Sequence, residues 1–199
     1  LPADIRDAGQ VAAMFAAFDE ELGGIDILVN NPFAGPRLPF IEITEAQWDL
    51  AMETNLKGYF LCSQTAAASM IEQGRGHIVN LSSIYGNYPV AGAAVYGATK
   101  AAVNVLSESL RQESQGKIKV TTIRPTGVPA TGLGAGVVNP AAVRGIRGQN
   151  EASFMETLGQ LLGENPPAAL TDPEKIGYFA LSPELLADQI VYAIDQPWG

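Results

Sequence analysis

The segment SIYGNYPVAGAAVYGATK (Ser83–Lys100) decides how this chain is organised. It contains Tyr96 and Lys100, four residues apart, at the point where helical spacing begins. The apolar residues that set this spacing recur every three or four positions, at Val95, Ala98, Ala102, Val105, Leu106 and Leu110. Residues four apart lie on one face of a helix, so the sequence predicts that the phenol and the ammonium point into the same site.

Ser83 lies thirteen residues before Tyr96 and follows the apolar run Ile78–Leu81, which is typical of a buried strand. A strand end and a helix start would bring the three polar groups together. A free tyrosine has a pKa near ~10, but an ammonium at ~4 Å and an effective dielectric of ~20 contributes roughly 4 kcal/mol, or about three pKa units. The trio therefore suits proton transfer to a carbonyl or from an alcohol. The alternative is an exposed Tyr–Lys pair, worth ~0.2–0.5 kcal/mol.

These residues resemble the active site of the short-chain dehydrogenase/reductase family, in which a Ser precedes Tyr-x-x-x-Lys. The resemblance implies a Rossmann-like, doubly wound parallel sheet in a three-layer α/β/α arrangement. It implies that Tyr96 exchanges the proton, that Ser83 orients the substrate oxygen, and that Lys100 lowers the pKa of Tyr96 and binds the nicotinamide ribose. Asn55, within Thr54-Asn55-Leu56-Lys57-Gly58, matches the family's fourth catalytic residue, which holds a relay water where its helix is distorted.

The same resemblance assigns contacts to an NAD or NADP cofactor, without distinguishing the two. The expected cofactor residues are Asp4, Ile5, Asn30, Tyr96, Lys100, Pro125 and Val128, with Thr126 and Thr131 as further candidates. Two departures from the family pattern occur here. Pro32-Phe33 interrupt an Asn-Asn-Ala-Gly motif after Asn30, and Thr126 separates Pro125 from Gly127. For Asn30-Asn31 the alternative is an ordinary turn.

Strand and helix patterns alternate along the chain, as in a parallel α/β sheet. The predicted strands are 25–30, 77–82 and 118–123, and the predicted helices are 7–22, 44–71, 95–115, 151–163 and 183–196. Asp7 can cap the first helix, and Thr44 with Gln47 forms a capping box for the second. Along the second helix, one apolar face is predicted from Trp48, Met52, Leu56 and Phe60.

Composition limits the function classes. A net charge of −9 argues against a nucleic-acid interface, and the apolar runs are shorter than a membrane span. The single cysteine, Cys62, excludes an internal disulfide and is expected to be a buried thiol. No metal-ligand spacing is legible, and His77, the only histidine, is expected at the surface or at a cap. A cytoplasmic setting fits this composition.

We expect residues 1–199 to form a single but partial dinucleotide-binding domain. No Gly-rich phosphate-binding turn is found in the sequence, which begins about where the third strand of the family ends. The N-terminal βαβ unit and the last strand are therefore expected to be missing. Within the domain, residues 127–183 are expected to cover and select the substrate, because residues 127–150 show little periodicity and 164–183 are Pro-rich.

Three functions are weighed. The leading hypothesis is an NAD(P)-dependent oxidoreductase that interconverts a small-molecule alcohol and a carbonyl. The second is an inactive fragment, or a binding or assembly protein, on the same fold, motivated by the absent Gly-rich turn. The third, dehalogenation without a cofactor, is disfavoured because the relatives that do this carry Arg at the position of Lys100. The resemblance also implies a homodimer or homotetramer built on the Asn55 and Tyr96 helices.

Overall fold

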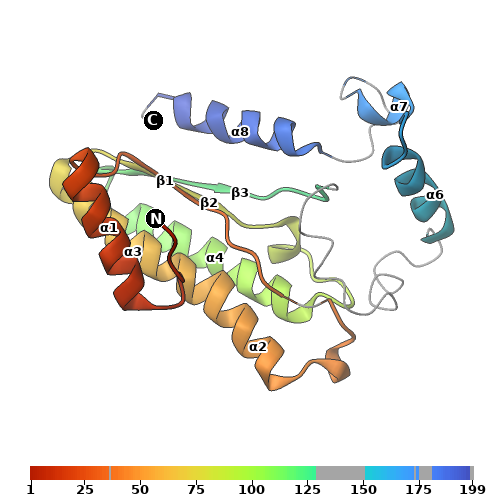
Figure 1. The fold of residues 1–199 in the computed structure, drawn as a ribbon, viewed down its shortest axis with the longest axis horizontal. Helices are drawn as coiled ribbons and strands as arrows, with labels where there is room; N and C mark the ends of the chain where they lie inside the picture. The colour runs from red at the N-terminus through yellow and green to blue at the C-terminus, as the bar shows by residue number, and fades with distance from the viewer. Residues whose placement is uncertain (36, 129–150, 173, 175–180, 198–199) are drawn as a thin grey trace.

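A three-stranded parallel sheet forms the centre of the computed structural model, which describes all residues except 36, 129–150, 173, 175–180 and 198–199 (Figure 1). Its strands are β1 (Ile27–Asn30), β2 (His77–Leu81) and β3 (Lys119–Ile123), in the order β1-β2-β3. His77 of the central strand is in register with Ile27 on one side and Lys119 on the other. Every residue of β2 is buried, which is the usual state of a central parallel strand.

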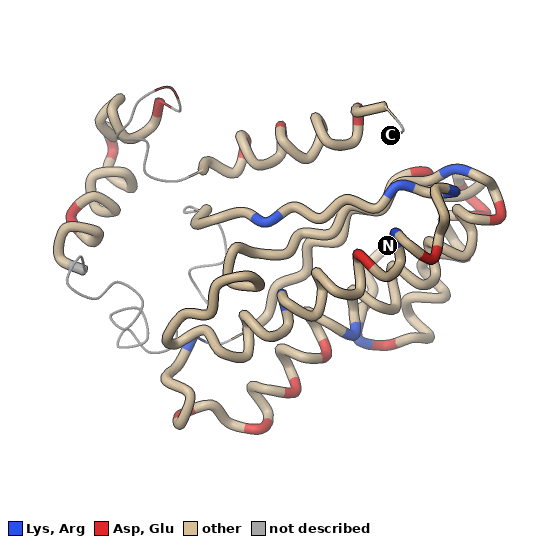
Figure 2. The backbone as a smooth tube through the Cα atoms, turned by 180° about the vertical axis from the view of Figure 1, so that it is seen from behind, with Lys and Arg blue, Asp and Glu red and all other residues tan. Residues whose placement is uncertain are grey.

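Helices cover both faces of this sheet. The helices α1 (Ala8–Leu22), α3 (Gly58–Gln73) and α4 (Ala94–Glu113) lie on one side, and α8 (Pro183–Asp195) lies on the other (Figures 1 and 2). Two shorter helices, α6 (Glu151–Leu161) and α7 (Ala168–Thr171), lie beyond one end of the sheet. The predicted Rossmann-like α/β fold with a parallel sheet is confirmed.

The predicted caps at the starts of the first two helices are confirmed. Asp7 accepts a hydrogen bond from the backbone of Gln10 at the start of α1, and Gly23 ends that helix in the left-handed conformation. Thr44 and Gln47 form the predicted capping box of α2 (Glu45–Met52). The segment 164–183, predicted as irregular, contains the single helical turn α7.

The long helix expected from Thr44 to Ile71 has three parts. A π-helical turn, Glu53–Lys57, joins α2 to α3. Residues four apart no longer align across a π-turn, because its hydrogen bonds span five residues instead of four. The predicted apolar face is therefore wrong, and Trp48 and Phe60 are 46% and 45% exposed. The buried side chains of α3 include Tyr59, Cys62, Ala66 and Met70.

The helix α4 is confirmed, but the apolar residues whose spacing predicted it do not all lie on its buried face. Val105 is 66% exposed and Leu106 39% exposed, whereas the buried face carries Tyr96, Thr99 and Lys100. The buried face of this helix thus combines Val95 and Val103 with polar residues, among them Lys100, which reaches the end of β2. The main apolar cluster lies instead between α1, α3 and the sheet, where Val11 and Phe15 pack with the α3 residues and Ile78 (the cluster is Val11, Phe15, Cys62, Ala66, Ala67, Met70, Ile78 and Ile118).

None of the helices in the described part of the chain is long and apolar enough to traverse a bilayer.

Gly76 brings α3 and β2 into close contact. Its φ is +155°, and a Cβ atom there would lie 2.3 Å from Cγ of Met70, which is completely buried. A side chain at this position would both strain the backbone and displace Met70 from the core.

We expect Gly76→Ala to lower the free energy of unfolding by about 2–4 kcal/mol in urea denaturation. The matched control is Gly159→Ala in exposed α6, where an added Cβ meets nothing within 4 Å. That variant should be stabilised by up to about 1 kcal/mol through helix propensity. Equal effects of the two substitutions would contradict this account of Gly76.

His77 is buried, not at the surface as expected from the sequence. It is 4% exposed because it begins the central strand, and its Nε2 lies 2.8 Å from Oγ1 of Thr121. Its Nδ1 is buried without a hydrogen-bond partner. Burial, with a smaller contribution from the charge of Lys119, lowers the pKa of His77 to about 4.

This lowered pKa predicts acid sensitivity. Between about pH 6.5 and pH 4 the unfolded chain binds a proton on His77 that the folded chain excludes, so stability falls as the pH falls through this window. We expect the wild type to have a higher free energy of unfolding than His77→Gln. This difference should decrease as the pH is lowered from about 6.5 to 4. A difference that is constant with pH would show that His77 titrates normally in the fold.

Candidate active site

A cavity of about 480 Å³ lies at the carboxyl ends of the strands. In doubly wound sheets, this edge is where ligands bind. Six of the residues predicted from the sequence line the cavity: Ser83, Tyr96, Lys100, Pro125, Thr126 and Val128. The structure thus brings together side chains that come from the end of β2, from α4 and from the loop after β3.

Ser83 and Tyr96 line the same cavity, and the Ser83 hydroxyl favours the charged form of Tyr96 and so lowers its pKa. Ser83 has an extended backbone and caps the short 3₁₀-helix η3 (Ile84–Gly86), accepting a hydrogen bond from the backbone N–H of Tyr85 at 3.2 Å. Gly86 allows η3 to approach α4, since a Cβ atom there would lie 2.8 Å from the carbonyl carbon of Lys100. Close packing of η3 on α4 therefore sets the position of Ser83 against Tyr96.

The pKa of Tyr96 is raised, not lowered as expected from the sequence. Burial is the largest cause, while the hydroxyl of Ser83 and the charge of Arg37 act in the opposite direction. The ammonium of Lys100 lies 5.8 Å from the centroid of the Tyr96 ring, and its hydrogen bonds go elsewhere. In this arrangement the phenol is the stable form of Tyr96, which suits a proton donor.

Lys100 is held at the end of the central strand. Its Nζ donates to the carbonyl of Leu81 at 2.7 Å and to the phenol oxygen of Tyr59 at 3.1 Å, and Tyr59 itself donates to the same carbonyl. Burial lowers the pKa of Lys100 to about 8 and raises that of Tyr59. Lys100 can therefore lose its proton near neutral pH, as a member of a proton relay must.

Asn55 lies in the π-turn and is completely buried. Its Oδ1 accepts from the backbone N–H of Ala34 at 2.7 Å, and its Nδ2 donates to the carbonyl of Ala34 and to Oγ1 of Thr99 at 3.4 Å. The helix distortion implied by the resemblance is present at this residue. Asn55 does not line the cavity but ties the loop after β1 to α4, which carries Tyr96 and Lys100.

We expect Asn55→Ala to lower the free energy of unfolding by about 2 kcal/mol, because both backbone groups of Ala34 lose their partner. The matched control is Asn31→Ala, in the same loop but exposed, which should change stability by less than about 0.5 kcal/mol. Chemical denaturation of the two variants measures the difference. Similar stabilities for both would contradict the anchoring role of Asn55.

Asn30 lies below the cavity and not in its wall. Its Nδ2 donates to Oδ1 of Asn80 at 2.8 Å and to Oγ of Ser63 at 2.9 Å, and Asn80 in turn donates to Ser107 at 2.8 Å. The cavity wall is formed by the next residue, Asn31. The role of Asn30 in cofactor binding stays a prediction, and in the structure it links β1, β2 and the two helices behind them.

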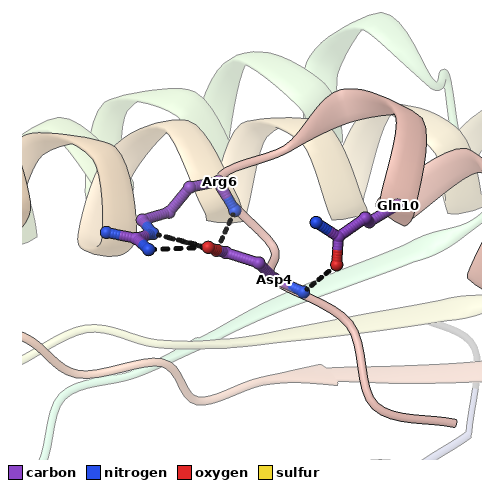
Figure 3. A network of polar contacts seen from close by, with 3 residues as sticks. All are labelled: Asp4, Arg6 and Gln10. Carbon is purple, nitrogen blue, oxygen red and sulfur yellow. Dashed lines mark hydrogen bonds and ion pairs between the residues drawn. The ribbon is translucent and has the colours of Figure 1, made fainter.

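The predicted adenine contacts, Asp4 and Ile5, are far from Tyr96 in the sequence. They are not among the residues that line the cavity. The carboxylate of Asp4 is bound by the guanidinium of Arg6 at 2.6–3.1 Å, while its backbone N–H donates to Gln10 (Figure 3). The ion pair lowers the pKa of Asp4 to about 2. The contact of Asp4 and Ile5 with the cofactor stays a prediction. Thr131, a further predicted cofactor residue, lies outside the residues that the structure describes.

Of the cavity residues that were not predicted from the sequence, Phe33, Arg37 and Tyr85 lie against the ring of Tyr96. The rings of Phe33 and Tyr85 meet that of Tyr96 edge-on, with centroids 5.6 Å and 6.3 Å away. The guanidinium of Arg37 lies 5.5 Å from the centroid of the Tyr96 ring. The only sequence signal was the Pro32-Phe33 interruption, which marks this loop as unusual without showing what its side chains contact.

A family model described as short chain dehydrogenase matches residues 1–140. The chain belongs to the short-chain dehydrogenase family. This confirms the resemblance drawn from the Ser and Tyr-x-x-x-Lys residues. This short-chain dehydrogenase is 34% identical over 158 residues to an NADP-dependent 3-hydroxy acid dehydrogenase of Shigella flexneri, covering 78% of this chain and 61% of that protein.

Two further comparisons extend over nearly the whole chain. An uncharacterized oxidoreductase of Staphylococcus aureus strain USA300 is 30% identical over 200 residues, covering 99% of this chain and 70% of that protein. The closed form of a serine dehydrogenase complexed with NADP⁺ matches with a TM-score of 0.75 and 28% identity, covering 98% of this chain and 69% of that one. The chain thus spans 61% to 70% of the length of these two curated relatives.

Proposed function

We propose that this protein is a nicotinamide-dependent oxidoreductase that interconverts an alcohol and a carbonyl. The observation that carries the proposal is that Ser83, Tyr96 and Lys100 all line one cavity at the carboxyl ends of the strands. The family membership supports the reaction class. NADP is the cofactor to test first, because the S. flexneri relative is named as NADP-dependent and the serine dehydrogenase was solved with NADP⁺.

The cavity residues fit the nicotinamide end of such a cofactor. Pro125 and Val128 offer an apolar edge, and Lys100 is a cation within the same wall. We infer that Lys100 and Tyr96 hold the ribose and that Asp4, Ile5 and Asn30 serve the adenosine half. The cofactor supplies or accepts the hydride, and the protein's own groups handle the oxygen and its proton.

We infer the following roles for the protein's side chains. Ser83 holds the substrate oxygen by a hydrogen bond, and Tyr96 gives its proton to that oxygen or takes it back. The raised pKa of Tyr96 favours the phenol, which is the form needed for reduction of a carbonyl. Lys100, with a pKa of about 8, gives a proton back to Tyr96 and regains its own from solvent, while the carbonyl of Leu81 and the phenol of Tyr59 hold its amine in place.

The outer surface of α3 and α4 supports the proposed homo-oligomer. Phe60, Val105 and Leu106 are exposed there, beside a hollow of about 390 Å³ between the two helices. Apolar side chains gathered on one exposed surface are typical of a protein–protein interface. We infer that a second copy covers this surface.

We expect Tyr96→Phe in the full-length protein to reduce kcat at least about 100-fold, because the donor of the proton is lost. The matched control is Tyr85→Phe, which removes a tyrosine hydroxyl from the same cavity but leaves the hydroxyl of Tyr96 in place. Steady-state kinetics measure turnover, and fluorescence titration should show that affinity for NADP is largely retained, because Lys100 still holds the ribose. Near-normal turnover by Tyr96→Phe would overturn the mechanism.

A further inference from the structure

Arg37 is a cation in the active-site cavity without an assigned role. It lies in the loop after β1, where its guanidinium faces the Tyr96 ring at 5.5 Å from the centroid. Its Nε is buried and has no hydrogen-bond partner among the residues that the structure describes. A buried donor of a charged group that lacks a partner is unfavourable, which indicates a ligand that completes the site.

No carboxylate of the described chain neutralises this guanidinium. The ion pairs among the described residues join Asp4 to Arg6, Asp26 to Arg75 and Glu108 to Arg111. The lining residues of the cavity that the structure describes include neither Asp nor Glu. The stretches that the structure does not describe (36, 129–150, 173, 175–180 and 198–199) contain no acidic residue in their sequence.

The cavity is therefore cationic in a protein whose net charge is −9. The two cations among its described lining residues, Arg37 and Lys100, differ in their surroundings. Lys100 is bound by a carbonyl and a phenol, whereas the guanidinium of Arg37 has its contact with the Tyr96 ring. A planar guanidinium with free donors beside an apolar ring is suited to binding a carboxylate by two parallel hydrogen bonds.

We propose that Arg37 binds a carboxylate of the substrate, so that the enzyme acts on short hydroxy acids and the matching oxo acids. This inference rests on the proposed oxidoreductase function. With the carboxylate on Arg37, the reacting carbon of a short acid lies beside Tyr96 and Ser83, because the guanidinium stands directly over the Tyr96 ring. A longer acid would carry its reacting carbon past these two residues.

The cofactor is the other anion that Arg37 could bind, but its position favours the substrate. The guanidinium lies against Tyr96, the residue proposed to contact the substrate oxygen, and the phosphates of a dinucleotide bind at the amino end of a helix in this class of fold. Binding to the cofactor is therefore kept as an outcome of the test.

The kinetic test uses short 2- and 3-hydroxy acids and their methyl esters, with NADP, on the full-length protein. We expect the wild type to prefer an acid over its ester, and Arg37→Gln to raise the KM for that acid roughly 30-fold or more. The KM for the ester should be unchanged, and Arg37→Lys should restore part of the loss. The matched control is Arg124→Gln, which removes a positive charge outside the cavity lining, where Arg124 donates to Asn104 at 3.1 Å.

Three kinetic results would overturn the inference and leave the oxidoreductase function standing. The first is a wild type that prefers the esters. The second is an Arg37→Gln variant whose KM rises equally for the acid and the ester, and the third is an Arg37→Gln variant that loses only its affinity for NADP. The third result would assign Arg37 to the cofactor. An equal effect of Arg124→Gln on the acid would show that overall charge, and not contact, is responsible.

A binding measurement separates this inference from the proposed function. Calorimetry compares butanoate with butanamide, which has the same shape without the charge, in the presence of NADP. We expect butanoate to bind to the wild type but not to Arg37→Gln, and butanamide to bind to neither. Butanoate binding through Arg37 without turnover of any alcohol would refute the oxidoreductase function alone, while turnover of alcohols without butanoate binding would refute the carboxylate site alone.

Discussion

The placement of the buried Lys100 ammonium governs the rest of this site. A desolvated cation needs close hydrogen-bond acceptors, and the carbonyl of Leu81 with the phenol of Tyr59 provides them. Leu81 is the last residue of the central strand, so α4 must cross the end of the sheet at the height where Lys100 reaches that carbonyl. Tyr96, one turn earlier on α4, is thereby fixed beside Ser83, two residues beyond Leu81.

Around this fixed point, the loop after β1 determines what the cavity recognises. Asn55 secures the loop at Ala34, and the loop then places the ring of Phe33 and the charge of Arg37 against Tyr96. The reacting groups and the recognition groups thus come from different parts of the chain. A change in this loop can alter the ligand without moving the groups that exchange the proton, which is how one fold serves many substrates.

Local signals made much of this structure predictable. The cap at Asp7, the capping box at Thr44 and the spacing of Tyr96 and Lys100 depend on neighbours within a few residues, and all three were read correctly. Arg37 was missed because its contact with Tyr96 joins residues far apart in the chain. The expected exposure of His77 was wrong because its burial depends on the strands on both sides of it. The residues next to His77 in the sequence do not show that these strands flank it.

The π-turn Glu53–Lys57 has a consequence for how the chain length can vary. One residue more or less turns everything beyond it by about 100°, since an α-helix has 3.6 residues per turn. Deleting a residue here would give a regular helix, yet it would swing Cys62, Ala66 and Met70 out of the core or carry Asn55 away from Ala34. The number of residues between the two helices is thus as tightly constrained as any side chain in the cavity, although most of the residues in the turn are themselves ordinary.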